Sequence, residues 1–72
     1  MEEIMIKDKQ KYLDENYPFV GTPKITEIKT CIHCGKKFKV GDYRVFKDIT
    51  GFEAICCPNV LECGGTVIDW ID

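Results

Sequence analysis

Two short cysteine-rich segments lie within a chain of only 72 residues, and they limit what the chain can fold into. The first has the pattern C-x2-C-G-K-K-F and begins at Cys31, and the second runs from Cys57 to Gly65. Two residues between cysteines allow both sulfurs to reach one ion about 2.3 Å away. Together the segments predict one metal ion held by four thiolates, those of Cys31, Cys34, Cys57 and Cys63.

The small size of the chain makes such a site valuable for stability. A chain of this length covers only about 60% of its unfolded surface on folding, so its hydrophobic core alone stabilises it weakly. Its five cysteines therefore indicate either disulfides or a metal. The odd cysteine count and the lack of an export signal at the N-terminus favour reduced thiols, and no apolar run approaches the roughly 18 residues of a membrane span. We expect a cytoplasmic protein with one structural Zn²⁺ and no membrane association.

Two other residues compete for ligand positions. Strand alternation places Cys56 and Cys57 on opposite faces, so only one of them can point at the metal. Cys56 shares a face with Phe52 and Ala54, which favours Cys56 as a core residue and Cys57 as the ligand. His33 lies in the middle of the first cysteine turn, which points away from the ion, so we expect an exposed side chain there.

Local patterns predict a small β domain over residues 24–72, preceded by an N-terminal arm or short helix over residues 1–23. The prolines of the N-terminal segment end any helix by about Tyr17. Asp48 and Gly51 begin and end a turn sequence between two β-rich segments, which indicates an antiparallel hairpin. We expect about three to four short antiparallel strands, within residues 24–30, 43–47, 52–56 and 66–71.

The cysteine segments resemble those of the zinc-ribbon family, in which C-x2-C-G and C-P-x(n)-C-G turns form rubredoxin-like knuckles on two hairpins. The resemblance covers about residues 25–71 and rests on Cys31, Cys34, Gly35, Cys57, Pro58, Cys63 and Gly64. It implies a metal-stabilised zinc ribbon that serves as a module touching nucleic acid or a larger machine such as a polymerase or ribosome. The second segment departs from the family by having five residues, not two, between its cysteines. This insertion puts the usual amide hydrogen bonds to sulfur in doubt.

A closed four-thiolate site argues against catalysis. Zinc held by four sulfurs has no open position for water or substrate. The sequence also contains one histidine, no serine and no glycine-rich phosphate loop. We therefore expect a non-enzymatic binding module without a small-molecule substrate. A rubredoxin-like iron electron carrier is an alternative, and the insertion in the second segment counts against it.

Charge is distributed unevenly along the chain. Residues 1–23 carry three bases and five acids (−2), residues 24–47 seven and two (+5), and residues 48–72 none and five (−5), giving the formal net charge of −2. The middle stretch interleaves Phe38, Tyr43 and Phe46 with bases, a combination that single-stranded nucleic acid sites use. The candidate contacts are Lys36, Lys37, Lys39, Arg44 and Lys47. Because alternation sends some of these rings into the core, nucleic acid binding is the alternative to a protein partner.

A protein partner is the favoured interpretation. Val60 and Leu61 are adjacent apolar residues in the inserted loop, an unusual surface choice unless they dock on something or fold back over the site. Trp70 is more readily explained as a core residue than as an anchor for a partner, because so small a domain has few large residues with which to cover itself.

Overall fold

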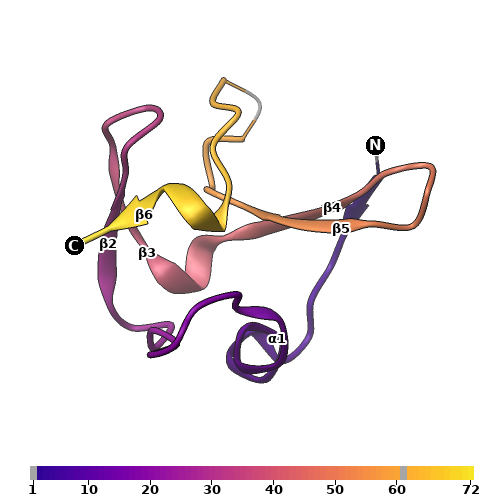
Figure 1. The fold of residues 1–72 in the computed structure, drawn as a ribbon, viewed down its shortest axis with the longest axis horizontal. Helices are drawn as coiled ribbons and strands as arrows, with labels where there is room; N and C mark the ends of the chain where they lie inside the picture. Colours follow the sequence, from indigo (N-terminus) through magenta and orange to yellow (C-terminus); the bar gives the residue numbers. More distant parts are fainter. Residues whose placement is uncertain (1, 61) are drawn as a thin grey trace.

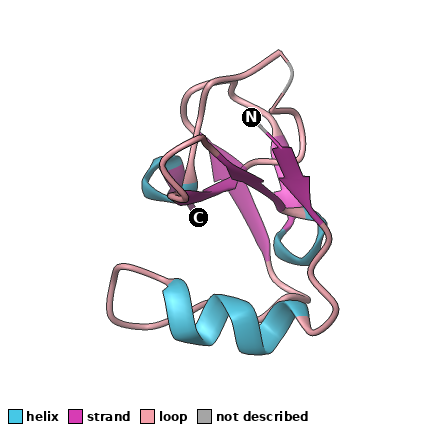
Figure 2. Ribbon diagram, turned by 90° about the vertical axis from the view of Figure 1, so that its right-hand side faces the viewer, coloured by secondary structure: helices cyan, strands magenta, loops and turns pink. Residues whose placement is uncertain are grey.

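A computed structural model describes residues 2–60 and 62–72 of the chain, and in this part it has two small antiparallel sheets and one α-helix. Each sheet has three strands (Figure 1), in the orders β1-β4-β5 and β3-β2-β6. The first consists of β1 (Glu2–Ile4), β4 (Arg44–Lys47) and β5 (Glu53–Cys56). The second consists of β2 (Ile28–Cys31), β3 (Lys37–Lys39) and β6 (Trp70–Ile71). Helix α1 (Lys9–Asn16) lies below both sheets (Figure 2).

The β4–β5 hairpin confirms the turn predicted from the sequence. Its register pairs Val45 with Ile55, and the turn is closed by the Gly51 N–H, which donates to the Asp48 carbonyl over 3.1 Å. Gly51 has a φ of 90°, a conformation that glycine adopts without strain. The Asp48 carboxylate accepts hydrogen bonds from the Thr50 hydroxyl and from two turn N–H groups, which hold its pKa below the usual value.

The two outer segments of the predicted β domain form shorter strands than expected. Residues 24–27 form a turn in which the Glu27 N–H donates to the Lys24 carbonyl, so the strand predicted over 24–30 begins only at β2. The strand predicted over 66–71 is a single 3₁₀ turn, η2 (Val67–Asp69), followed by two-residue β6. Thr66 and Asp69 cap that turn reciprocally. The chain also forms β1 and β3, which the sequence reading did not include.

The N-terminal segment packs on the rest of the chain through both its strand and its helix. β1 pairs with β4, and Arg44 donates two hydrogen bonds to the Glu3 carboxylate, at 2.9 and 2.7 Å. The Asp8 side chain caps the N-terminus of α1, and the helix ends before Tyr17, as expected from the sequence. The Lys9 ammonium donates to the carbonyl oxygens of Gly41 and Tyr43. A domain boundary at residue 23 stays a prediction.

A single hydrophobic cluster joins the helix to both sheets. Its buried members are Leu13, Val40, Tyr43, Val45, Ile55 and Trp70. Trp70 is only 7% exposed, which confirms its predicted place in the core. Its ring meets Phe38 edge-on with centroids 5.1 Å apart, and Tyr43 at 6.3 Å. The core therefore lies between the sheets and above α1, next to the cysteine-rich turns.

Replacement of Leu13 by alanine tests how much the helix contributes to this core. Leu13 is fully buried, so we expect Leu13→Ala to lower the free energy of unfolding by about 2–5 kcal/mol. Glu15→Ala, at an exposed position of the same helix, should change it by less than about 0.5 kcal/mol. Urea denaturation of the metal-loaded protein measures both. Equal midpoints for the two variants would contradict the role given to α1.

Candidate metal centre

The first cysteine turn connects the two strands of the β2–β3 hairpin. Cys31 ends β2, and the Gly35 N–H donates to the Cys31 carbonyl over 2.7 Å, which closes the turn. Gly35 has a φ of 74°, so glycine relieves the crowded turn as the sequence indicated. The Cys31 N–H in turn donates to the Lys36 carbonyl over 3.0 Å. This geometry fixes the backbone between Cys31 and Cys34.

The second cysteine turn begins directly after β5 and closes on the carbonyl group of Asn59. The N–H groups of Glu62 and Cys63 donate to this oxygen, at 3.0 and 2.9 Å. These two hydrogen bonds bring Cys63 back to Asn59, close to the start of the segment. The Cys57 N–H points at the Gly65 carbonyl, 3.5 Å away.

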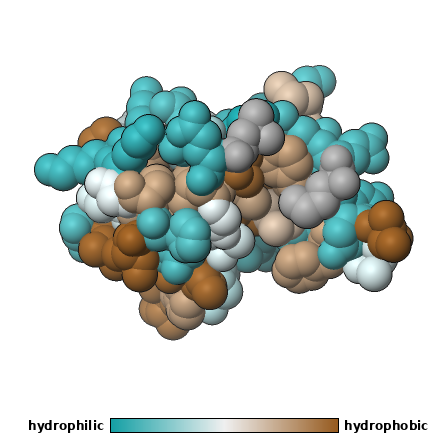
Figure 3. Space-filling model, turned by 90° about the horizontal axis from the view of Figure 1, so that it is seen from above, coloured by the Kyte–Doolittle hydropathy of each residue, from teal (hydrophilic) through white to brown (hydrophobic). Residues whose placement is uncertain are grey.

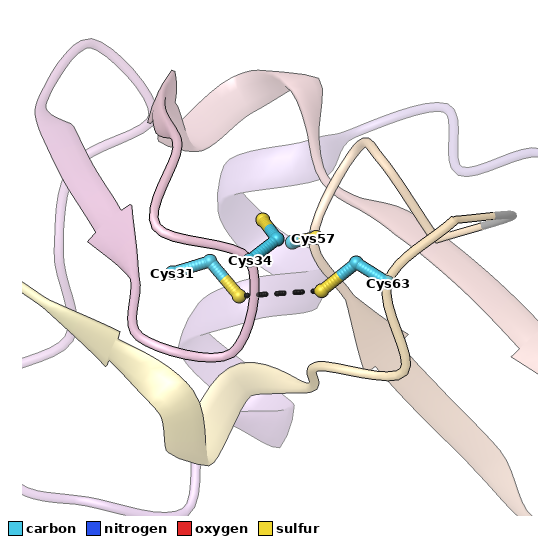
Figure 4. A group of neighbouring side chains, drawn as sticks. All are labelled: Cys31, Cys34, Cys57 and Cys63. Atoms are coloured by element: carbon cyan, nitrogen blue, oxygen red, sulfur yellow. Dashed lines mark hydrogen bonds between the residues drawn. The ribbon is translucent and has the colours of Figure 1, made fainter.

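The two turns bring the four predicted cysteines together, as Figure 4 shows. Their sulfur atoms all lie within 4.8 Å of one another, and those of Cys31 and Cys63 are 3.6 Å apart. Four thiolates around one ion with bonds of about 2.3 Å require sulfurs about 3.8 Å apart. Cys31, Cys57 and Cys63 are at most 2% exposed, whereas Cys34 is half-buried. The spacing and the all-sulfur donor set therefore fit a tetrahedral metal site.

Backbone amides also point at the sulfurs of both turns. The Gly65 N–H donates to Cys63 Sγ over 3.2 Å. The backbone of Asn59 acts to lower the pKa of Cys57, and that of Lys36 acts to lower the pKa of Cys34. Each of these groups lies two residues after its cysteine. The second turn thus keeps an amide hydrogen bond to the Cys63 sulfur despite the five-residue insertion.

Burial dominates the acid-base properties of the second pair of thiols. It raises the pKa of Cys57 to about 12 and also raises the pKa of Cys63, while the amide bonds act in the opposite direction. At Cys34 the order is reversed, and the Lys36 N–H holds the pKa below its ordinary value. Thiolates this close together and this buried are stable only with a cation between them. Without an ion these two thiols stay protonated, and metal binding would release their protons.

Gly65 is a functional position that sequence reasoning missed. A Cβ atom at Gly65 would lie 2.6 Å from the sulfur of Cys31 and 3.1 Å from that of Cys63, closer than carbon and sulfur tolerate. The absence of a side chain lets the backbone approach both sulfurs and donate its N–H to one of them. The adjacent Gly64 has no such constraint, since its nearest neighbour would be His33 at 3.6 Å. The pair of glycines in the sequence was the available signal.

The two competing residues lie outside the sulfur cluster. His33 is exposed, as predicted for the middle of the turn. Cys56 is 3% exposed, its sulfur lies 3.6 Å from the Ala54 carbonyl, and burial raises the pKa of its thiol. The cluster contains Cys57 instead, in agreement with the assignment made from strand alternation.

The candidate nucleic-acid contacts are divided between the two sheets. The exposed side chains of Lys36, Lys37 and Lys39 lie on or next to β3, whereas Lys47 and Arg44 lie on β4. Arg44 is occupied by its ion pair with Glu3 and lies over the ring of Phe46, 5.3 Å from its centroid.

Of the aromatic rings of the same stretch, one is buried, and those of Phe38 and Phe46 are half-buried. Tyr43 is fully buried, and Phe38 packs against Trp70. Of the two candidate protein contacts, Val60 is half-buried and Leu61 lies outside the described residues.

Comparison with protein-family models, curated proteins and solved structures finds no match for this chain. The assignment of the site therefore rests on its own geometry. Among the described residues, no helix is long and apolar enough to cross a membrane.

Proposed function

We propose that this chain is a small, non-enzymatic zinc-binding module of the zinc-ribbon type. Its metal stabilises the fold, and the folded chain presents a surface that binds a protein partner. The observation that carries the proposal is the cluster of four sulfurs, all within 4.8 Å of one another. Zinc is the usual ion for such a set in a reducing compartment, which is why we also propose a cytoplasmic location. With all four positions filled by cysteine, the ion stabilises the fold and presents no site for a substrate.

The placement of side chains supports a protein partner over single-stranded nucleic acid. A stacking site needs rings that bases can reach, and Tyr43 is fully buried while Phe38 packs against Trp70. Arg44 is already bound to Glu3 by two hydrogen bonds. Several large apolar side chains are exposed. Figure 3 shows some of them gathered toward one end of one face, between hydrophilic side chains.

An iron electron carrier is the second candidate, and a specific observation keeps it in view. Amide hydrogen bonds to the sulfurs tune the potential of iron–thiolate centres, and the Gly65 N–H donates one to Cys63 Sγ over 3.2 Å. The five-residue loop, which counts against such a carrier, leaves this bond in place. Zinc is favoured because an ion that only stabilises the fold does not need to change its oxidation state, and zinc is the usual ion of closed four-cysteine sites.

Elemental analysis of the purified, metal-replete protein tests the proposal and separates the two metals. We expect about one zinc per chain and a colourless solution, since a closed site of four thiolates holds one divalent ion. A red protein with visible absorption that bleaches on reduction would establish the iron alternative. A folded protein with four titratable cluster thiols and no stoichiometric transition metal would contradict both.

A further inference from the structure

The sheet formed by β3, β2 and β6 has one face against the core and one face open to solvent. Side chains alternate along its strands, and residues paired across neighbouring strands share a face. Cys31, Phe38 and Trp70 point to the inner face, where they are buried or half-buried. The strand register and the exposed fractions place six residues on the outer face: Ile28, Thr30, Ile32, Lys37, Lys39 and Ile71.

Three isoleucines form an apolar strip on this outer face. Ile28 lies on the central strand β2 and Ile32 in the cysteine turn that follows it, and each is 57% exposed. Ile71 lies beside them on β6, paired with Thr30, and is 48% exposed. Figure 3 shows apolar side chains gathered at the left-hand end of the molecule, the end that carries β2, β3 and β6 in Figure 1. Such a patch on so small a sheet indicates an interaction surface.

Two lysines border the apolar strip along β3. Lys37 is paired with Thr30 and Lys39 with Ile28, so both ammonium groups belong to the same face as the isoleucines. Both side chains are exposed, and among residues 2–60 and 62–72 neither takes part in an ion pair. The apolar strip therefore has a positively charged border made by residues of the face itself.

The acids nearest to this face are engaged elsewhere. The Glu27 carboxylate accepts a hydrogen bond from the Lys24 N–H over 2.7 Å. Asp72 forms an ion pair with Lys29, which points away from the outer face, and Asp69 caps the 3₁₀ turn η2. The two lysines consequently attract carboxylates from a partner and repel its bases.

The geometry of the face fits a helix. β2 is the central strand, so β3 and β6 already use its backbone groups on both sides and a partner meets side chains. β3 and β6 are about 10 Å apart across β2, which is about the diameter of an α-helix. Lys37 and Lys39 are separated by about 7 Å along their strand, and carboxylates at positions i and i+4 of a helix by about 6 Å.

Other occupants fit the face less well. A second copy of the same face supplies no carboxylate to either lysine, because the face carries none. Single-stranded nucleic acid needs rings on which bases can stack, whereas the outer face carries isoleucines and the Phe38 ring points inward against Trp70.

We propose that the outer face of β3, β2 and β6 binds an amphipathic helix of a partner protein that carries acidic residues along one flank of its apolar stripe. The apolar stripe packs on Ile28, Ile32 and Ile71, and two carboxylates one turn apart meet Lys37 and Lys39. This inference rests on the proposed function as a protein-binding module, and it names the surface and the class of partner.

The experiment uses the full, metal-loaded chain and a blocked, alanine-rich peptide of about 18 residues. The peptide has leucines along one helical face and glutamates at i and i+4 beside them. We expect NMR shifts centred on the methyl groups of the three isoleucines and a rise in peptide helicity on binding. The affinity should fall as ionic strength rises, and a peptide with lysine in place of glutamate should not bind.

Two pairs of variants test the surface. Lys39→Glu should weaken binding about tenfold, whereas Lys47→Glu, the same charge change on β4 of the other sheet, should leave the affinity within about twofold. Ile28→Ser should also weaken binding about tenfold through lost apolar contact. Its control is Ile49→Ser, at a fully exposed position in the β4–β5 turn, which should bind as the wild type does.

Several outcomes would overturn the proposal. These are equal effects of the two lysine variants, equal effects of the two isoleucine variants, or shifts centred on the other sheet. Self-association of the protein alone through the same methyl groups would make a second copy the occupant. Tighter binding of an oligothymidylate or of anionic lipid vesicles to this face would make nucleic acid or a membrane the occupant. Zinc content measured on the same sample separates each failure from failure of the proposed metal site.

Discussion

Removal of the metal is expected to leave the chain largely unfolded. Structural zinc sites contribute apparent binding energies of about 10–16 kcal/mol, more than the net stability that a core of this size supplies. Among residues 2–60 and 62–72, the buried cluster that joins helix and sheets has six members, and three of the four proposed ligands form a separate buried group beside it. Circular dichroism before and after addition of a strong chelator measures the effect, and re-addition of zinc should restore the folded spectrum.

Substitution of single cysteines distinguishes loss of the metal from a general effect on the core. Cys34→Ser and Cys63→Ser should each behave like the chelated protein. Cys56→Ser is the matched control for Cys63→Ser, because Cys56 is as buried as Cys63 but lies outside the sulfur cluster, and it should cost only about 1–3 kcal/mol. Melting of Cys34→Ser at the wild-type temperature would remove the argument that the metal holds the fold together.

Replacement of Gly65 by alanine is expected to weaken metal binding by about 10- to 100-fold, the range seen when groups supporting a metal's ligands are altered. The added methyl group would lie 2.6 Å from the Cys31 sulfur, so the ligand or the backbone must move. Movement of the backbone also disturbs the hydrogen bond from the Gly65 N–H to the Cys63 sulfur. Competition with a coloured zinc chelator measures the affinity directly.

The neighbouring glycine provides the control for this experiment. Gly64→Ala introduces the same methyl group one residue earlier, where the nearest neighbour is the exposed His33 ring at an ordinary contact distance of 3.6 Å. We expect metal affinity within about twofold of the wild type, as for surface substitutions in general. If both variants lose the metal to the same extent, the close approach of Gly65 to the sulfurs is not the cause.

The sequence was sufficient where chemistry or local pattern decides the structure. Four cysteines at knuckle spacing predicted the cluster, and strand alternation separated Cys57 from Cys56. The β4–β5 hairpin was predictable because Asp48 and Gly51 form a turn whose hydrogen bonds are all local. Each prediction used residues close together in the chain: the cysteines of one segment, successive residues of one strand, or the two ends of one turn.

The sequence was insufficient where distant segments decide the structure. β1, β3 and β6 have two or three residues each, too few to show a period, and β1 exists because it pairs with β4 some forty residues away. The role of Gly65 depends on its approach to Cys31, which no local pattern encodes.

The two pairs of sulfurs come from different sheets. Cys31 and Cys34 belong to the β2–β3 hairpin, whereas Cys57 follows β5 directly. With an ion bound as proposed, any motion that separates the sheets must stretch metal–sulfur bonds. The ion therefore links the two small sheets to each other. Loss of the metal is therefore expected to loosen the contact between the two sheets as well as the cysteine turns themselves.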